Sequence, residues 1–152
     1  MGGIPMIYTD KTKKAMKLCY DAHKGQVDKS GLPYVFHPAH VAEQMTDEAT
    51  TIVALLHDVV EDTDYTLEDL AAEGFGKDIL EAVALMTHED DVPYLDYVAK
   101  LKDNPIARAV KLADLAHNSD LSRIGEVDDE IRKRLEKYKK ATALLKESIA
   151  DE

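Results

Sequence analysis

Hydrophobic residues recur along this chain at intervals of three and four, the spacing that places side chains on one face of a helix. Breaks in the pattern fall at Gly31, Pro33, Gly74 and Gly76, residues typical of turns and loops. No segment alternates apolar and polar residues as a half-buried strand would. The helices expected from this pattern cover about residues 9–22, 38–45, 46–59, 66–73, 79–86, 94–101, 105–116 and 128–149.

The helix expected at residues 46–59 is apolar on nearly every side, which is typical of a helix at the centre of a core. Neither an internal repeat nor a long linker divides the 152 residues, and this length suits one domain with a substantial core. We therefore predict an all-α fold, a single compact bundle of about six to eight helices that forms one domain over residues 1–152.

The composition is that of a soluble globular protein, with 45% hydrophobic and 32% charged residues. No apolar run approaches the ~20 residues that a membrane span needs. Residues 1–10 lack a basic stretch followed by an apolar one, so we expect no signal peptide. Cys19 is the single cysteine and cannot form an internal disulfide, which favours a reducing, cytoplasmic location.

The formal net charge of −11 restricts the binding partners. Nucleic acid polymers bind proteins through Lys and Arg, and anionic membranes attract basic surfaces, so neither is expected as a partner. A small phosphorylated ligand is compatible with this charge, because a bound dication and a few local Lys residues can dominate the field of one pocket.

Four polar side chains follow the central apolar helix: His57, Asp58, Glu61 and Asp62. Burying such groups without partners is costly, whereas a divalent cation binds both neutral imidazole and carboxylate. Residues four apart lie one above the other on a helix. This segment is therefore predicted to offer two metal ligands first and two acid–base carboxylates one turn later.

Asp114 is a carboxylate inside the apolar stretch 110–116, where it needs a partner. His37 stands at the start of another helix, where a lone histidine is usually a cap or a core residue. Two imidazoles and two carboxylates from three helices, however, suit Mn, Fe, Zn or Mg chemistry, and structural zinc would favour cysteines. The candidate ligands of one divalent ion are His37, His57, Asp58 and Asp114.

The order of these residues, His then His-Asp then Asp, resembles the signature of the HD phosphohydrolase superfamily. Longer stretches are similar to one branch of it, the hydrolase domain of RelA/SpoT-type alarmone enzymes and their small stand-alone relatives. The similar stretches follow in order along nearly the whole chain, at 22–26, 29–38, 55–63, 75–76, 111–114 and 117–118. The resemblance implies an HD-domain bundle and a hydrolase that removes the 3′-pyrophosphate of guanosine tetra- and pentaphosphate, which are small phosphorylated nucleotides.

The resemblance also implies a role for individual residues. His37, His57, Asp58 and Asp114 would bind Mn²⁺ or another divalent ion. Glu61 and Asp62 would orient and deprotonate the attacking water. The residues expected to contact the substrate are Lys29, Ser30, Asn118 and Tyr138, of which Tyr138 is equally explained as one more apolar-face residue of the last helix.

One position departs from the family pattern. The family commonly has an arginine that stacks on the guanine base where this chain has Asp28. A carboxylate cannot make a cation–π contact, so weak discrimination between guanine and adenine is expected. Two alternatives stay open: another nucleotide phosphatase or nucleotidase of the HD superfamily, and a non-catalytic nucleotide-binding module, although Glu61 and Asp62 favour an enzyme. Because the chain ends soon after the last helix, no synthetase or regulatory domain is expected.

Overall fold

The computed structural model describes residues 6–150, which form ten helices and one isolated antiparallel bridge between Val27 and Pro33. The first half of the region in which we expect no signal peptide, residues 1–5, lies outside the described residues. The helices are α1 (Asp10–His23), α2 (Phe36–Glu43), α3 (Glu48–Leu56), α4 (Val59–Asp62), α5 (Leu67–Ala72), α6 (Lys77–Met86), α7 (Tyr94–Leu101), α8 (Pro105–Asn118), α9 (Leu121–Ile124) and α10 (Asp129–Ala150).

The predicted all-α class is confirmed. Two of the ten helices, α4 and α9, are single turns of four residues, and the remaining eight agree with the predicted number. None of the helices over residues 6–150 is long and apolar enough to cross a membrane.

Local sequence sets most of the helix starts. Thr9, Asp47, Thr66 and Asn104 each accept a hydrogen bond from the backbone N–H three residues later, which satisfies a donor that the first helical turn leaves free. Pro105 follows Asn104 at the first helical position, where its missing N–H has no cost. These caps explain why the predicted starts of α1, α3, α5 and α8 agree with the structure.

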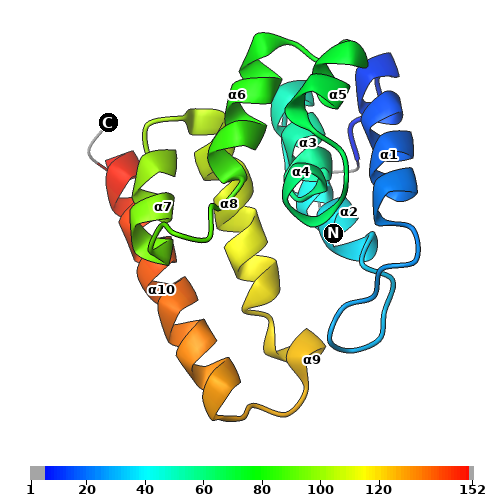
Figure 1. Ribbon diagram of the computed structural model, residues 1–152. Coiled ribbons are helices and arrows are strands. Elements are labelled where there is room, and N and C mark those ends of the chain that lie inside the picture. Colours follow the sequence, from blue (N-terminus) through cyan, green and yellow to red (C-terminus); the bar gives the residue numbers. More distant parts are fainter. Residues whose placement is uncertain (1–5, 151–152) are drawn as a thin grey trace.

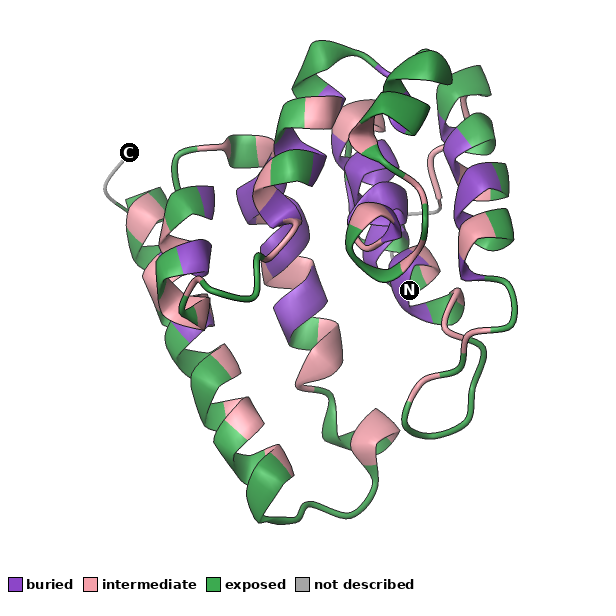
Figure 2. Ribbon diagram, in the orientation of Figure 1, coloured by how far each residue is buried: buried purple, intermediate pink, exposed green. Residues whose placement is uncertain are grey.

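The helix α3 lies at the centre of the bundle, as the apolar pattern predicted. Every residue from Thr50 to Leu56 is buried, and α3 packs against α1, α2, α6 and α8. The burial colours of Figure 2 show this core on α3 and on the adjoining half of α8. The long helix α10 packs against α7 and α8, and α9 joins α8 to it at one end of the molecule (Figure 1).

The sequence predicted one continuous helix over residues 46–59, and this was wrong. The helix α3 ends at Leu56, and His57 and Asp58 form a turn before α4 begins at Val59. The His57 ring Nδ1 lies 2.5 Å from the carbonyl oxygen of Ala54, which would otherwise accept the backbone N–H of Asp58 in an uninterrupted helix. The side chain thus takes over a backbone acceptor at the point where the chain turns.

Candidate active site

The four predicted metal ligands converge in the structure. His37 comes from the first turn of α2, His57 and Asp58 from the turn between α3 and α4, and Asp114 from α8. One ligand atom of each lies within 4.8 Å of the others. Three of the four residues are buried and Asp58 is half-buried, so the cluster forms an interior polar site with one accessible side.

The ring nitrogens of both histidines face the two carboxylates. His37 Nε2 lies 2.8 Å from Asp114 Oδ1, and His57 Nε2 lies 3.1 Å from Asp58 Oδ2 and 3.4 Å from Asp114 Oδ1. On its other side, His37 Nδ1 lies 2.7 Å from Nδ1 of His117, and the two rings are stacked.

His57 provides a test of whether these residues fit a metal ion. Its Nδ1–H donates to the Ala54 carbonyl, so in the neutral ring Nε2 carries only a lone pair. That Nε2 atom is buried, makes no hydrogen bond with the described residues, and faces carboxylate oxygens that are acceptors as well. A cation between them removes this conflict. Neutral imidazole and carboxylate are the donor set of Mn, Fe, Zn and Mg-type ions, so the residues fit a divalent metal.

In the metal-free protein a proton can take the place of that cation. Burial alone would lower the pKa of His57, but the neighbouring Asp58 and Asp114 carboxylates raise it well above its usual range. The two carboxylates therefore favour positive charge at the position of His57 Nε2, and a divalent ion would supply such a charge there.

Lys111 is a residue of the candidate site that the sequence prediction did not include. Its ammonium group lies 3.0 Å from Asp114 Oδ2 and 5.4 and 5.3 Å from the ring centres of Tyr94 and Tyr97. Burial opposes the charge of Lys111, yet Asp114 raises its pKa well above the usual value. Burial would raise the pKa of Asp114, but Lys111 and the hydrogen-bonding histidines His37 and His57 together hold it well below the ordinary range. The two residues therefore form a buried ion pair on α8, and a lysine inside the apolar run before Asp114 was the signal for it.

Glu61 and Asp62, the predicted acid–base residues, lie beside the cluster on α4. Asp58, Glu61 and Asp62 each have one carboxylate oxygen that lies within 4.8 Å of the corresponding oxygens of the other two. Glu61 Oε1 also accepts the backbone N–H of His88 at 2.6 Å. Burial and then the Asp58 charge raise the pKa of both carboxyl groups. Both side chains line a pocket of about 210 Å³ that also opens onto His57, Asp58, Lys111 and Asp114.

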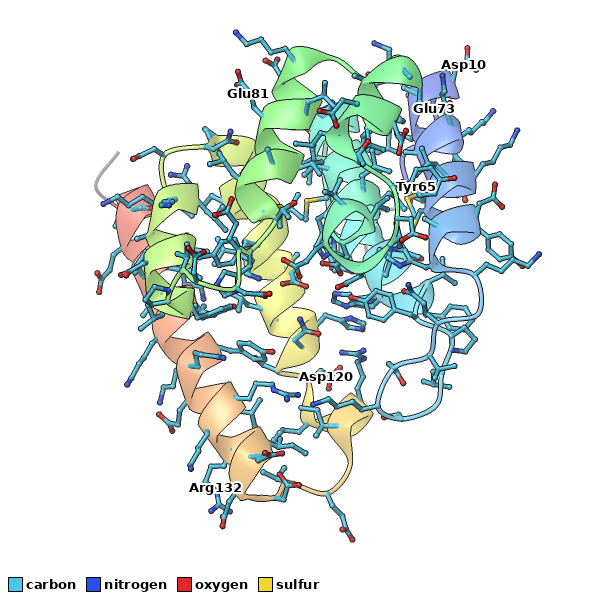
Figure 3. All side chains as sticks on the ribbon, viewed as in Figure 1. Asp10, Tyr65, Glu73, Glu81, Asp120 and Arg132 are labelled. Atoms are coloured by element: carbon cyan, nitrogen blue, oxygen red, sulfur yellow. The ribbon has the colours of Figure 1, made fainter. Side chains whose placement is uncertain are left out.

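A second pocket, of about 460 Å³, adjoins the first, and Tyr34, Asn118 and Tyr138 line both. It lies between the α1–α2 loop, α9 and α10, and Figure 3 shows side chains of these segments extending toward one another. All four predicted substrate-contact residues line it. They are Lys29, Ser30, Asn118 and Tyr138, accompanied by the cations Arg123 and Arg134 and by the apolar Ile124, Ile131 and Leu135.

Asp28 has a structural role that the sequence did not reveal. Its Oδ1 accepts the backbone N–H groups of Ser30 and Leu32 at 2.8 and 3.0 Å, a turn that shapes the loop. Its Oδ2 lies 3.7 Å from the Arg123 guanidinium. The Ser30 hydroxyl donates to the Arg123 carbonyl at 3.0 Å. Arg123 lies on α9, a single turn that the sequence did not predict, so a guanidinium reaches this pocket from a different element.

The sequence of residues 15–132 matches the profile of a family described as HD domain. The chain belongs to the HD domain family. The four candidate ligands that converge, two histidines and two aspartates, are the His and Asp residues on which the HD resemblance was based. The predicted membership of the HD family is confirmed, whereas the roles of the individual residues stay predictions.

Curated relatives agree with this assignment. The chain is 32% identical over 148 residues to the bifunctional (p)ppGpp synthase/hydrolase SpoT of Escherichia coli, covering 87% of this chain and 20% of the relative. It is 34% identical over 133 residues to the guanosine-3′,5′-bis(diphosphate) 3′-pyrophosphohydrolase of Haemophilus influenzae, covering 77% and 19%. It is 38% identical over 134 residues to the GTP pyrophosphokinase of Streptomyces coelicolor, covering 77% and 16%. The chain thus spans about a fifth of the length of these relatives.

A solved structure shares the fold. It is a metazoan ortholog of SpoT, described as hydrolysing ppGpp, and superposes with a TM-score of 0.71 over 95% of this chain and 97% of the other. The two sequences are 24% identical, so the likeness establishes the fold. Unlike the longer relatives, the solved metazoan protein matches this chain along nearly the whole length of both.

Proposed function

We propose that residues 1–152 form a single HD hydrolase domain, a metal-dependent phosphohydrolase that releases pyrophosphate from the 3′ position of a guanosine 3′,5′-bis(diphosphate)-like nucleotide. One observation carries the proposal: two imidazoles and two carboxylates face one another beside Glu61 and Asp62, in a pocket that opens into a cation-lined, partly apolar one. The activities named for the relatives supply the substrate class.

His37, His57, Asp58 and Asp114 would hold the ion, and their donor set accepts Mn²⁺ or another divalent metal. When bound, such an ion acidifies a water molecule and stabilises the charge that develops on phosphate oxygens. The buried Lys111–Asp114 pair adds a fixed cation to the same pocket, which favours an anionic substrate in a chain that is acidic as a whole.

Glu61 and Asp62 handle the proton of the attacking water. Their raised pKa values make both carboxylates stronger bases than a solvated carboxylate. The His88 backbone N–H holds Glu61 in place, while the exposed faces of both side chains stay open to the pocket. Water attacks the phosphorus attached to the 3′ oxygen, the bond between them breaks, and guanosine 5′-diphosphate and pyrophosphate leave.

The second pocket suits the rest of the nucleotide. Its apolar walls offer surface to a base, and Lys29, Arg123 and Arg134 offer positive charge to the remaining phosphates. Tyr34, Asn118 and Tyr138 stand where the two pockets meet, the position expected for contacts with the sugar. No nucleic acid polymer or membrane is part of this function, and the buried, free Cys19 is compatible with a cytoplasmic location.

The test is a substrate screen of the purified protein with Mn²⁺. Guanosine and adenosine 3′,5′-bis(diphosphates), the corresponding 5′-triphosphates and nucleoside monophosphates are offered, and products are separated by ion exchange. Pyrophosphate release from the 3′-diphosphates supports the proposal. Phosphate release from monophosphates alone would favour the nucleotidase alternative, and binding without turnover of any nucleotide would favour the non-catalytic module.

A further inference from the structure

The α1–α2 loop reaches one metal-ligand candidate directly. The hydroxyl of Tyr34 donates to Asp58 Oδ2 at 2.5 Å. The hydroxyl is the donor of this pair, because an ionised carboxylate only accepts hydrogen bonds. The ring is held on both sides, with centroids 5.0 Å from His23 and 5.7 Å from His37. The Asp58 carboxylate therefore has a hydrogen-bond partner outside the turn that carries it.

The same loop also reaches the far end of α4. The side-chain amide of Gln26 donates to the backbone carbonyl of Asp62 at 3.0 Å. That carbonyl ends α4 and has no partner within the helix. The Gln26 amide is itself oriented, because its Oε1 lies 2.8 Å from His23 Nδ1. Burial lowers the pKa of His23, which favours the neutral ring. His23 Nδ1–H then donates to Gln26 Oε1, and the amide nitrogen of Gln26 faces the Asp62 carbonyl.

Tyr34 and Gln26 also belong to one unit of the loop. The backbone N–H of Tyr34 donates to the Gln26 carbonyl at 2.8 Å, and Val27 and Pro33 form the isolated bridge beside it. One hydrogen-bonded loop segment therefore contacts the four-residue helix α4 at both ends. It contacts the side chain of Asp58 before the helix and the backbone carbonyl of Asp62, the last helical residue.

We propose that Tyr34 and Gln26 are positioning residues of the active site: Tyr34 orients Asp58 toward the ion, and Gln26 anchors Asp62 so that its carboxylate faces the same pocket. A four-residue helix has too few internal hydrogen bonds to hold this geometry by itself, and carboxylates that bind metals are commonly oriented by outer hydrogen bonds. The inference rests on the proposed metal site.

The first test replaces Tyr34 by Phe, which keeps the ring between His23 and His37 and removes only the hydroxyl. Mn²⁺ affinity of chelator-treated protein is measured by competition with a fluorescent chelator. We expect a loss of about 10–100-fold, the range for removing an outer partner of a metal ligand. Tyr65→Phe is the matched control: that ring packs against the core after α4 and is labelled in Figure 3. Its Mn²⁺ affinity should stay within about twofold of wild type.

The second test replaces Gln26 by Leu, which has a similar size but no amide. Within residues 6–150, the Gln26 side chain hydrogen-bonds to the Asp62 carbonyl and to His23, but to no candidate metal ligand. We therefore expect kcat at saturating Mn²⁺ to fall about tenfold or more, while Mn²⁺ affinity stays within about twofold of wild type. Circular dichroism and the thermal midpoint verify that each variant is folded. A merely structural role would lower the midpoint without separating metal affinity from kcat in this way.

The outcomes separate this inference from the proposed function. Unchanged Mn²⁺ affinity in Tyr34→Phe, or unchanged kcat in Gln26→Leu, overturns the corresponding half of the inference and leaves the hydrolase proposal standing. Weakened Mn²⁺ binding in Tyr34→Phe, in a protein that hydrolyses none of the nucleotides, supports the orienting role and refutes the proposed function. A wild-type protein that binds no Mn²⁺ overturns both.

Discussion

Lys111→Met removes the buried cation that pairs with Asp114 and keeps most of the volume of the side chain. The side chains of Lys111 and Asp114 are 11% and 6% exposed, and their charged atoms lie 3.0 Å apart. Without the ammonium group, the buried Asp114 carboxylate keeps His37, His57 and Asn118 as partners among residues 6–150, and the Asp58 carboxylate lies in the same cluster. The metal-free protein should therefore be strongly destabilised.

The expected magnitude follows from this burial. Removing one partner of a buried ion pair costs about 3–5 kcal/mol, and additional protonation of the nearby histidines places the expectation at the lower end. A domain of this size has a free energy of unfolding of about 5–15 kcal/mol, so the variant should fold with a reduced margin. Added Mn²⁺ stabilises any protein that binds it only when folded, by about 2.7 kcal/mol at a hundred times Kd. The difference between wild type and variant should shrink in Mn²⁺, because the ion becomes the counter-charge of Asp114.

The assay is urea unfolding of both proteins, first with chelator and then with Mn²⁺. Lys77→Met is the matched control, because Lys77 pairs with Glu81 at 3.7 Å and both side chains are exposed, by 85% and 55%. An exposed pair contributes about 0–1 kcal/mol, so this variant should unfold almost like wild type. If Lys111→Met loses no more free energy of unfolding than Lys77→Met in chelator, the buried Lys111–Asp114 ion pair does not stabilise the fold as its geometry indicates.

Further predictions concern the carboxylates. Glu61→Gln and Asp62→Asn should each lower turnover by about 10²–10⁴-fold, the usual cost of losing a general base, with Mn²⁺ content near wild type. A raised pKa means that the folded protein holds the carboxyl proton more tightly than the unfolded chain, so stability declines as pH rises through that pKa. Both variants should thus raise the thermal midpoint of the metal-free protein at neutral pH. Turnover near that of wild type in either variant would contradict the catalytic role of the residue replaced. Asp58→Ala should abolish Mn²⁺ binding measured by metal analysis of gel-filtered protein; retained stoichiometric metal would place the site elsewhere. The stacking argument alone would have Asp28→Arg improve guanine binding by a cation–π contact. The change also removes two loop hydrogen bonds and sets a second cation beside Arg123, so titration with the guanine nucleotide should show weaker binding. Tighter binding would support the stacking argument instead.

Local signals explain how much of the fold was predictable. Thr9, Asp47 and Thr66 cap helices through contacts three residues away, and the limits of α7 were predicted to the residue. The break after Leu56 was not predictable from apolar periodicity, because it depends on a side chain that takes a backbone acceptor. The single turn α9 is too short for a period to be detected.

The candidate site was likewise only partly predictable from the sequence. Residue types and family resemblance brought His37 and Asp114 together in the prediction, although they are 77 positions apart, and the structure places them in contact. Contacts such as Arg123 with Asp28, or Gln26 with Asp62, carry no periodic or compositional signal, since each depends on how two distant segments pack. The sequence showed a missing arginine at position 28 but not the loop hydrogen bonds that the Asp28 carboxylate accepts, and the expected weak base discrimination stays a prediction.

The central claim is that hydrolysis occurs at one divalent ion held by His37, His57, Asp58 and Asp114. Its most direct test is a titration of chelator-treated protein with Mn²⁺, in which bound metal and pyrophosphate release from guanosine 3′,5′-bis(diphosphate) are followed in the same samples. We predict that both rise together and saturate at about one ion per chain, with guanosine 5′-diphosphate as the second product. Full activity in the chelator-treated protein, or one bound ion without any pyrophosphate release, would contradict the account.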